Sequence, residues 1–149
     1  TDTMTPPGLN EFKRQTFDRV LGATPEAVEG AVLRSEAVGA WSLNQVAGDL
    51  AALLTVSRGE ALGVLGISRA RERRNPKMKM DAALLDRLYS ALDLYARVAS
   101  LIGEEPTPGW FRAPKAAHGG ARPLDLLETR VGVARLSRTL SALEDGAFL

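Results

Sequence analysis

The sequence contains no cysteine and only one histidine, His118. Without cysteine the chain forms no disulfide, carries no thiol nucleophile and offers no cysteine ligand for zinc. A single imidazole cannot supply a multi-histidine metal site or a catalytic pair of histidines. We therefore expect no metal site, no cofactor and no catalytic residues, and an enzyme is the least favoured class of function.

Long apolar runs and a strong charge of one sign are also missing. No uninterrupted apolar segment approaches the roughly 18 residues of a transmembrane helix, and residues 1–5 lack the apolar core of a signal peptide. These features predict a cytoplasmic protein without a membrane partner. The net charge is +1, so any binding of nucleic acid has to come from a local basic patch.

Aromatic residues make up 5% of the chain, whereas hydrophobic residues together make up 45%. The core must therefore consist mainly of Leu, Val and Ala, and the scarcity of β-branched runs favours helices over strands. We predict an all-α protein. Residues 1–8, which include Pro6-Pro7-Gly8, are expected to form a disordered lead-in.

Local motifs place the first two helices. One helix is predicted over residues 9–21, where Gly22 ends it. A second helix starts at Thr24-Pro25-Glu26, which supplies a capping hydroxyl, a proline at the first helical position and an acid in the first turn. We expect this helix to run to about Val38. Its expected inward-facing residues are Val28, Val32 and Leu33.

A helix-turn-helix is predicted between about residues 42 and 80. Capping boxes of the form S-x-x-Q and S-x-x-E begin at Ser42 and Ser57, and Ser68 can cap a third short helix. Short helices in this succession are typical of a helix-turn-helix. The turn Leu65-Gly66-Ile67-Ser68, with its isoleucine in the core, resembles the turn of Xre-like bacterial DNA-binding domains.

Residues 68–79 form a strongly basic segment, in which the third helix is ended early by Asn75-Pro76. Six basic residues stand against one acid, Glu72, which gives the segment a net charge of +5. After a helix-turn-helix corner this cluster predicts contact with operator DNA. A solvated basic face, or a surface that pairs with an acidic toxin, explains the same charge. The predicted DNA-binding residues are Arg69, Arg71, Arg73, Arg74, Lys77 and Lys79.

The longest helix is predicted over about residues 81–102 and completes a helical part that spans residues 9–103. Its apolar residues recur every three or four positions, at Leu84, Leu88, Leu92, Tyr95, Val98 and Ile102. Further apolar residues widen this stripe enough for two packing surfaces, one toward the helix-turn-helix and one toward a C-terminal domain or a dimer mate. The Gly- and Pro-rich segment 103–109 is the predicted boundary to a second domain, residues 104–149.

The C-terminal part combines loops rich in Gly and Pro with two short helical segments. Trp110 is expected either to fill a small core or to contact a partner. His118, beside two glycines, is expected to be an exposed loop residue. Asp125 follows Pro123 in the first turn of a short helix, so we interpret it as a partner of the helix dipole rather than as a catalytic acid.

The last helix is predicted over about residues 133–143, and Gly146 stops it. The apolar tail Ala147-Phe148-Leu149 follows. Two interpretations of the tail remain open: it folds back on the core of its own chain, or it inserts into a partner.

The order of residues from Trp110 onward resembles a known family. Trp, Pro, Gly-Gly, Pro-Leu-Asp-Leu-Leu, Thr, Gly and Glu-x-Gly follow one another as in the toxin-binding domain of the MbcA/ParS/Xre antitoxins. The resemblance is close over residues 110–149 and looser over the helix-turn-helix. Three positions depart from the family pattern, because Lys115 replaces an Asn, His118 an apolar residue and Arg122 a Thr or Ser.

The resemblance implies an Xre-like helix-turn-helix bundle followed by a small helical toxin-binding domain. Such an antitoxin blocks a RES-type, NAD-consuming toxin sterically, with the tail at or beside the toxin's active-site cleft, and autoregulates its operon as a DNA-binding homodimer. A stand-alone helix-turn-helix regulator, whose C-terminal domain dimerises or binds a ligand, is the alternative. The implied toxin-binding residues are Trp110, Phe111, Arg122, Pro123, Asp125, Thr129, Gly146, Ala147, Phe148 and Leu149.

Overall fold

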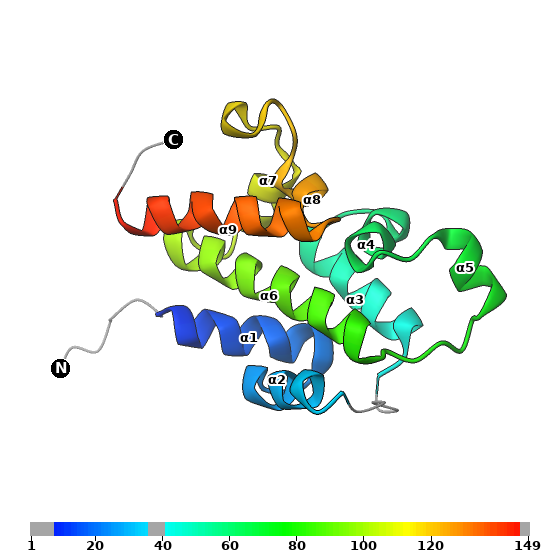
Figure 1. The fold of residues 1–149 in the computed structure, drawn as a ribbon. Coiled ribbons are helices and arrows are strands. Elements are labelled where there is room, and N and C mark those ends of the chain that lie inside the picture. The colour runs from blue at the N-terminus through cyan, green and yellow to red at the C-terminus, as the bar shows by residue number, and fades with distance from the viewer. Residues whose placement is uncertain (1–7, 36–40, 147–149) are drawn as a thin grey trace.

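The computed structural model describes residues 8–35 and 41–146, and Figure 1 shows helices joined by short connections. These ranges contain no strand, only an isolated bridge between Ser42 and Lys79. The predicted all-α class is confirmed. Residues 1–7 of the expected lead-in lie outside the described ranges. The helices are α1 (Leu9–Leu21), α2 (Pro25–Leu33), α3 (Leu43–Leu54), α4 (Arg58–Leu65), α5 (Arg69–Arg74), α6 (Ala82–Ile102), α7 (Thr107–Arg112), the 3-10 turn η1 (Ala116–His118), α8 (Pro123–Leu126) and α9 (Arg130–Glu144).

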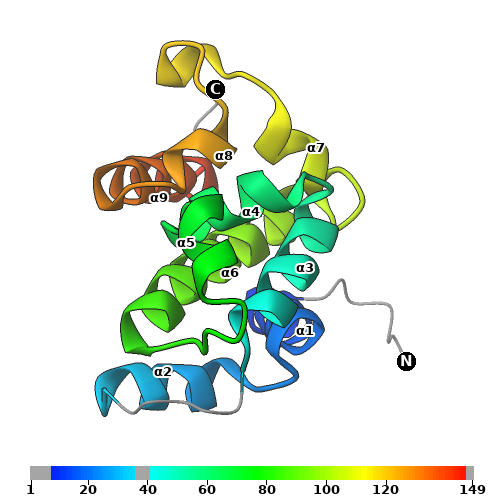
Figure 2. The ribbon, with the colours of Figure 1, turned by 90° about the vertical axis from the view of Figure 1, so that its right-hand side faces the viewer.

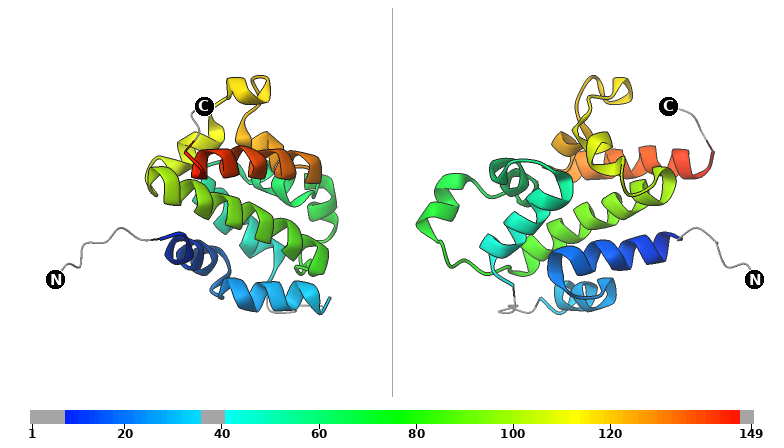
Figure 3. Two further views of the ribbon diagram at one scale, coloured as in Figure 1. Left: turned by 60° about the vertical axis from the view of Figure 1, so that its left-hand side comes forward. Right: turned by 180° about the vertical axis from the view of Figure 1, so that it is seen from behind.

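The long helix α6 lies at the centre of the fold. Figures 1 and 3 show α9 along one side of α6 and α1 along the other, and α2 also packs on α6. The predicted apolar stripe is buried at Leu84, Leu88, Leu92, Tyr95 and Val98. Ile102 is an exception to the prediction, since 43% of its surface is exposed at the last residue of the helix. None of the described helices is both long and apolar enough to cross a membrane.

Side-chain caps start several helices at the predicted positions. The capping box at Ser57 is complete, because the Glu60 carboxylate accepts a hydrogen bond from the Ser57 N–H. The box at Ser42 is only half formed, since the Gln45 side chain donates to Asp49 instead. Four hydroxyl groups each accept a hydrogen bond from the N–H three residues further on, those of Thr24, Ser42, Ser57 and Ser68.

Helix α2 is shorter than predicted. It ends at Leu33 rather than near Val38, because the chain turns at Ser35, where φ is +53°. Val28 is buried as expected, but Leu33 is 77% exposed, so its prediction as an inward-facing residue is wrong. Residues 36–38 of the predicted helix lie outside the described ranges.

One continuous hydrophobic core includes residues from both predicted domains. Phe17 near the N-terminus belongs to the same cluster as Phe111 and Leu140, and the Phe111 ring stacks on the Tyr95 ring with centroids 5.8 Å apart. Phe111 lies on α7, a helix that the sequence analysis did not predict. The division at residue 103 stays a prediction, and its two parts share this core.

Candidate functional site

The basic helix α5 projects from one end of the bundle (Figure 1), and this end faces the viewer in Figure 2. It follows a corner built as predicted, in which Gly66 adopts a φ of +76°, Ile67 is buried and the Ser68 hydroxyl accepts from the Arg71 N–H at 3.1 Å. None of the residues of α5 is buried. The six predicted DNA-binding residues are all exposed, four on α5 and two on the chain that returns from it: Arg69, Arg71, Arg73, Arg74, Lys77 and Lys79.

The single acid of this segment faces the body of the protein. The Glu72 carboxylate pairs with Arg58 of α4, and the same guanidinium donates to the Asn44 side-chain oxygen at 2.6 Å. Arg58 therefore neutralises Glu72 and anchors α5, which has no buried side chain of its own. None of the six basic side chains forms an ion pair within the described ranges, so their charge faces solvent undiminished.

The chain returning from α5 is fixed to the start of α3. The Met78 carbonyl accepts from the Leu43 N–H, and the Met80 N–H donates to the Trp41 carbonyl, each at 2.9 Å. The Met80 side chain is fully buried. Lys79, between these two bonds, is therefore held in a defined place beside the start of α3. The sequence analysis missed this anchoring, because hydrogen bonds between backbone segments so far apart leave no local pattern.

In the C-terminal part, the residues implied by the resemblance divide into internal and surface groups. Phe111 and Pro123 are buried, so they support the surface and do not form it. Trp110 is half-buried, with the Lys115 ammonium 5.0 Å above its ring. Trp110 thus packs on the core and keeps part of its surface accessible. Its contact with a partner stays a prediction. Thr129 is exposed, and its hydroxyl caps α9 by accepting from the Gly132 N–H.

Arg122 stands at the N-terminal cap of α8, where the family pattern has Thr or Ser. Its backbone N–H and its guanidinium both donate to Asp125, the latter at 2.7 and 3.1 Å, and these hydrogen bonds hold the Asp125 pKa below its usual value. The guanidinium also donates to Glu60 of α4 at 3.0 Å. Asp125 therefore caps and orients α8, in agreement with its interpretation as a helix-terminus acid, and Arg122 joins α8 to α4.

His118 is buried, with 5% of its surface exposed, so its prediction as an exposed loop residue is wrong. The turn η1 and the left-handed Gly119, with φ +64°, direct the chain so that the imidazole faces inward. Its Nδ1 atom has no hydrogen-bond partner among the described residues. The family pattern already pointed to burial of His118, because the residue at this position is usually apolar in the family.

Protonation of His118 is expected to destabilise the fold. Burial, with the positive charges of Arg135 and Lys115, lowers the His118 pKa. The folded chain then binds this proton more weakly than the unfolded chain. The free energy of unfolding is therefore highest above about pH 6.5, the ordinary pKa of histidine, and decreases as the pH drops through the pKa of the folded state. Urea unfolding at about pH 7.5 and 5.5 measures this loss, which His118→Leu should reduce. An unchanged pH dependence in the variant would contradict the assignment.

Two grooves flank α9 at its opposite ends. One, of about 240 Å³, includes Asp86, Arg87 and Thr129 in its lining. Arg87, which the sequence analysis overlooked, donates to the Glu128 carbonyl at 2.6 Å and to the Val64 carbonyl at 3.3 Å, so it connects α6 to the turn before α9 and to α4. The other groove, of about 210 Å³, is apolar and includes Trp110 in its lining.

Gly146 is the last described residue, with φ +93°. The other predicted tail residues, Ala147, Phe148 and Leu149, lie outside the described ranges. Within those ranges there is no group of three or more His, Cys, Asp or Glu side chains that could hold a metal ion.

Comparison with known proteins gives one local similarity. No protein-family model matches the chain. The Prs ADP-ribosylating antitoxin of Sphingobium sp. (strain YBL2) is 49% identical to the chain over 39 residues, which are 26% of this chain and 24% of the relative. The match thus spans about a quarter of the relative's length, and the similarity is to one segment of an antitoxin.

Proposed function

We propose that the chain is an antitoxin that binds a RES-type, NAD-consuming toxin and blocks it sterically. The 49% identity to a segment of a protein named as an antitoxin carries this proposal. The order of residues after Trp110, which resembles the MbcA/ParS/Xre toxin-binding domain, also supports it. The name of the relative refers to ADP-ribosylation, a transfer for which NAD is the usual donor, and this agrees with a toxin that uses NAD.

The toxin-binding surface lies on α7, α8 and the start of α9. Arg122, Asp125 and Thr129 keep exposed area there while their polar groups are fixed by mutual pairing or by a helix cap. Such side chains lose little conformational freedom on binding, so their contacts contribute more to affinity. Trp110 supplies an aromatic edge of the kind that anchors protein interfaces, and Phe111 and Pro123 hold the backbone beneath.

A second activity, operator binding, rests on α5. Six exposed basic residues follow a helix-turn-helix corner, and their one acidic neighbour is neutralised by Arg58. Phosphate contacts by such residues supply most of the non-specific affinity for DNA. Because paired recognition helices match two-fold operators, the proposed DNA-binding form is a homodimer. In the alternative function, a stand-alone helix-turn-helix regulator, the chain binds DNA in the same way but has no toxin partner.

Co-expression with the protein encoded by the adjacent reading frame tests the antitoxin proposal. We expect that this neighbour alone arrests growth and lowers cellular NAD, that the chain restores both, and that the two proteins elute as one complex on size exclusion. A neighbour that is harmless, or that neither binds the chain nor is neutralised by it, overturns the antitoxin proposal and favours the stand-alone regulator.

Deletion of residues 147–149 is expected to weaken toxin neutralisation while leaving DNA binding intact. The tail contains one aromatic residue, Phe148, and removal of an anchoring aromatic residue costs at least about 2 kcal/mol at an interface, which lowers affinity at least ~30-fold. Growth rescue and toxin affinity measure the effect, with Leu33→Ser, a change at the exposed end of α2, as the control. Full protection by the truncated chain would rule out a role of the tail.

A further inference from the structure

An apolar groove at the C-terminal end of α9 has no cover within the described ranges. It measures about 210 Å³ and lies between the ends of α6 and α9 and the helix α7. Leu101 and Ile102 in its wall are 40% and 43% exposed. The space is smaller than the ~300–1,000 Å³ pockets that hold drug-sized ligands, so it suits one or two apolar side chains. Its lining residues are Val98, Leu101, Ile102, Trp110, Leu140 and Leu143.

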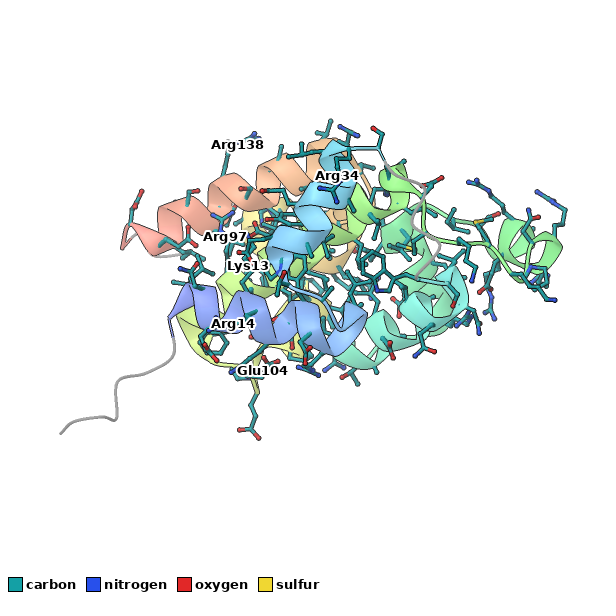
Figure 4. The ribbon with its side chains drawn as sticks, turned by 90° about the horizontal axis from the view of Figure 1, so that it is seen from below. Lys13, Arg14, Arg34, Arg97, Glu104 and Arg138 are labelled. Carbon is teal, nitrogen blue, oxygen red and sulfur yellow. The ribbon has the colours of Figure 1, made fainter. Side chains whose placement is uncertain are left out.

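The walls of this groove are fixed by Arg97 of α6, which is labelled in Figure 4. Its guanidinium donates to the Ser137 hydroxyl at 2.8 Å, to the Ser141 hydroxyl at 3.1 Å and to the Glu144 carboxylate at 2.9 and 3.0 Å. These bonds lie along the last turns of α9 and hold that helix against α6. The groove is therefore preformed.

The chain turns back at the end of α9, beside this groove. The Gly146 N–H donates to the Leu143 carbonyl at 3.0 Å, and Gly146 has a φ of +93°. This bond and a glycine of positive φ are features of the Schellman ending, in which the next residues reverse direction and an apolar one contacts the last helical turn. Leu143, which accepts the bond, also lines the groove.

We propose that the groove is the docking site of this chain's own tail, Ala147-Phe148-Leu149, in the partner-free protein. The tail is apolar, as is the groove, and begins directly after the reversal at Gly146. Two extended residues reach about 7 Å, which brings Phe148 to the side chains around Leu143. Burial of the phenylalanine also covers Leu101 and Ile102, whose exposure is otherwise unfavourable.

If the chain binds a toxin as proposed above, this docking adds a step to toxin binding. The tail leaves the groove when the toxin takes it up, so the groove and the toxin compete for the same side chains. The apparent affinity for the toxin falls by the fraction of molecules whose tail is docked. The groove also keeps an apolar segment covered until the partner arrives, which limits non-specific association.

Cysteine cross-linking of the full chain tests the docking, and the absence of native cysteine leaves the introduced pair as the only thiols. Leu101→Cys with Phe148→Cys is expected to form an intramolecular disulfide at least tenfold faster than Val131→Cys with Phe148→Cys. Val131 lies at the opposite end of α9 and is 79% exposed. Equal rates for the two pairs overturn the proposal, and a disulfide formed between chains overturns it in favour of a second copy in the groove.

A second readout needs no cysteine. Phe148→Ala is expected to shift the indole N–H resonance of Trp110, which lines the groove, and to leave that of Trp41, which donates to the Leu21 carbonyl far from the groove, unchanged. An unmoved Trp110 resonance contradicts docking.

The oxidised, cross-linked form of the Leu101→Cys, Phe148→Cys chain should neutralise toxin less well than its reduced form. A cross-linked chain that neutralises fully leaves the docking in place and overturns only the role of the tail in toxin binding.

Discussion

Gly132→Ala is expected to destabilise the protein by about 3 kcal/mol, the upper part of the range for overpacking. A methyl group at this position would lie 2.2 Å from the Leu126 carbonyl oxygen and 2.8 Å from the carbonyl carbon and Cα of the same residue. All three are backbone atoms, so no side-chain rotation relieves the overlap. Helix α8 must then move away from α9, and the Arg122–Asp125 surface moves with it. Urea unfolding measures the loss, and toxin affinity should fall in parallel.

Whether Gly132→Ala lowers or raises the free energy of unfolding shows which factor dominates at this position, tertiary packing or helix propensity. Glycine inside a helix is about 1 kcal/mol less favourable than alanine, so propensity alone predicts that Gly132→Ala stabilises α9. Gly48→Ala in α3 is the matched control, because its methyl group would meet only the Arg58 guanidinium at 3.9 Å. The control should gain up to about 1 kcal/mol. Equal gains at both positions would show that α8 and α9 do not approach as closely as described.

Several helix starts were predictable from the sequence because caps are local, although α9 begins at Arg130, after the Thr129 cap, and not near residue 133 as predicted. The hydroxyls of Ser57 and Ser68 and the proline at residue 25 act within one turn, and each of their helices begins as expected. Ends and facing directions depend on distant neighbours, which explains the errors at Leu33, Ile102 and His118. Helix α7 was missed because its prolines indicated a linker, although prolines at residues 106 and 108 fit a first turn, where the proline nitrogen needs no hydrogen.

The candidate site was predictable to a similar degree. Clustered charge marked the basic segment, and the structure places its six basic residues, all exposed, on α5 and on the chain that returns from it. The residues that hold this surface in place were not predictable, because Arg58 and Glu72, or Arg122 and Glu60, meet only in the fold. Opposite charges are too common along the sequence for one pair to be selected without the coordinates. The assignments of DNA-binding and toxin-binding residues stay predictions.

Combined replacement of Arg69 and Arg73 by alanine is expected to lower operator affinity by at least about 2 kcal/mol, or ~30-fold, and to reduce the salt dependence of binding. Each arginine that contacts a base edge contributes about 1–3 kcal/mol to binding. Loss of one arginine that contacts a phosphate lowers the slope of log affinity against log salt concentration by about 1. The two residues stand four positions apart on α5, so their side chains leave the same face. Titration of the DNA upstream of the reading frame at several salt concentrations measures both quantities.

Arg14→Ala with Arg138→Ala is the matched control, since it removes the same two charges. Figure 4 shows these residues on α1 and α9, away from α5. If bulk charge drove binding, both double variants would lose the same affinity, because long-range attraction depends on net charge. If α5 contacts the DNA directly, only the α5 variant changes the number of counterions released, and hence the slope. Identical slopes for the two variants would therefore reject a DNA-contacting role for α5, whatever their absolute affinities.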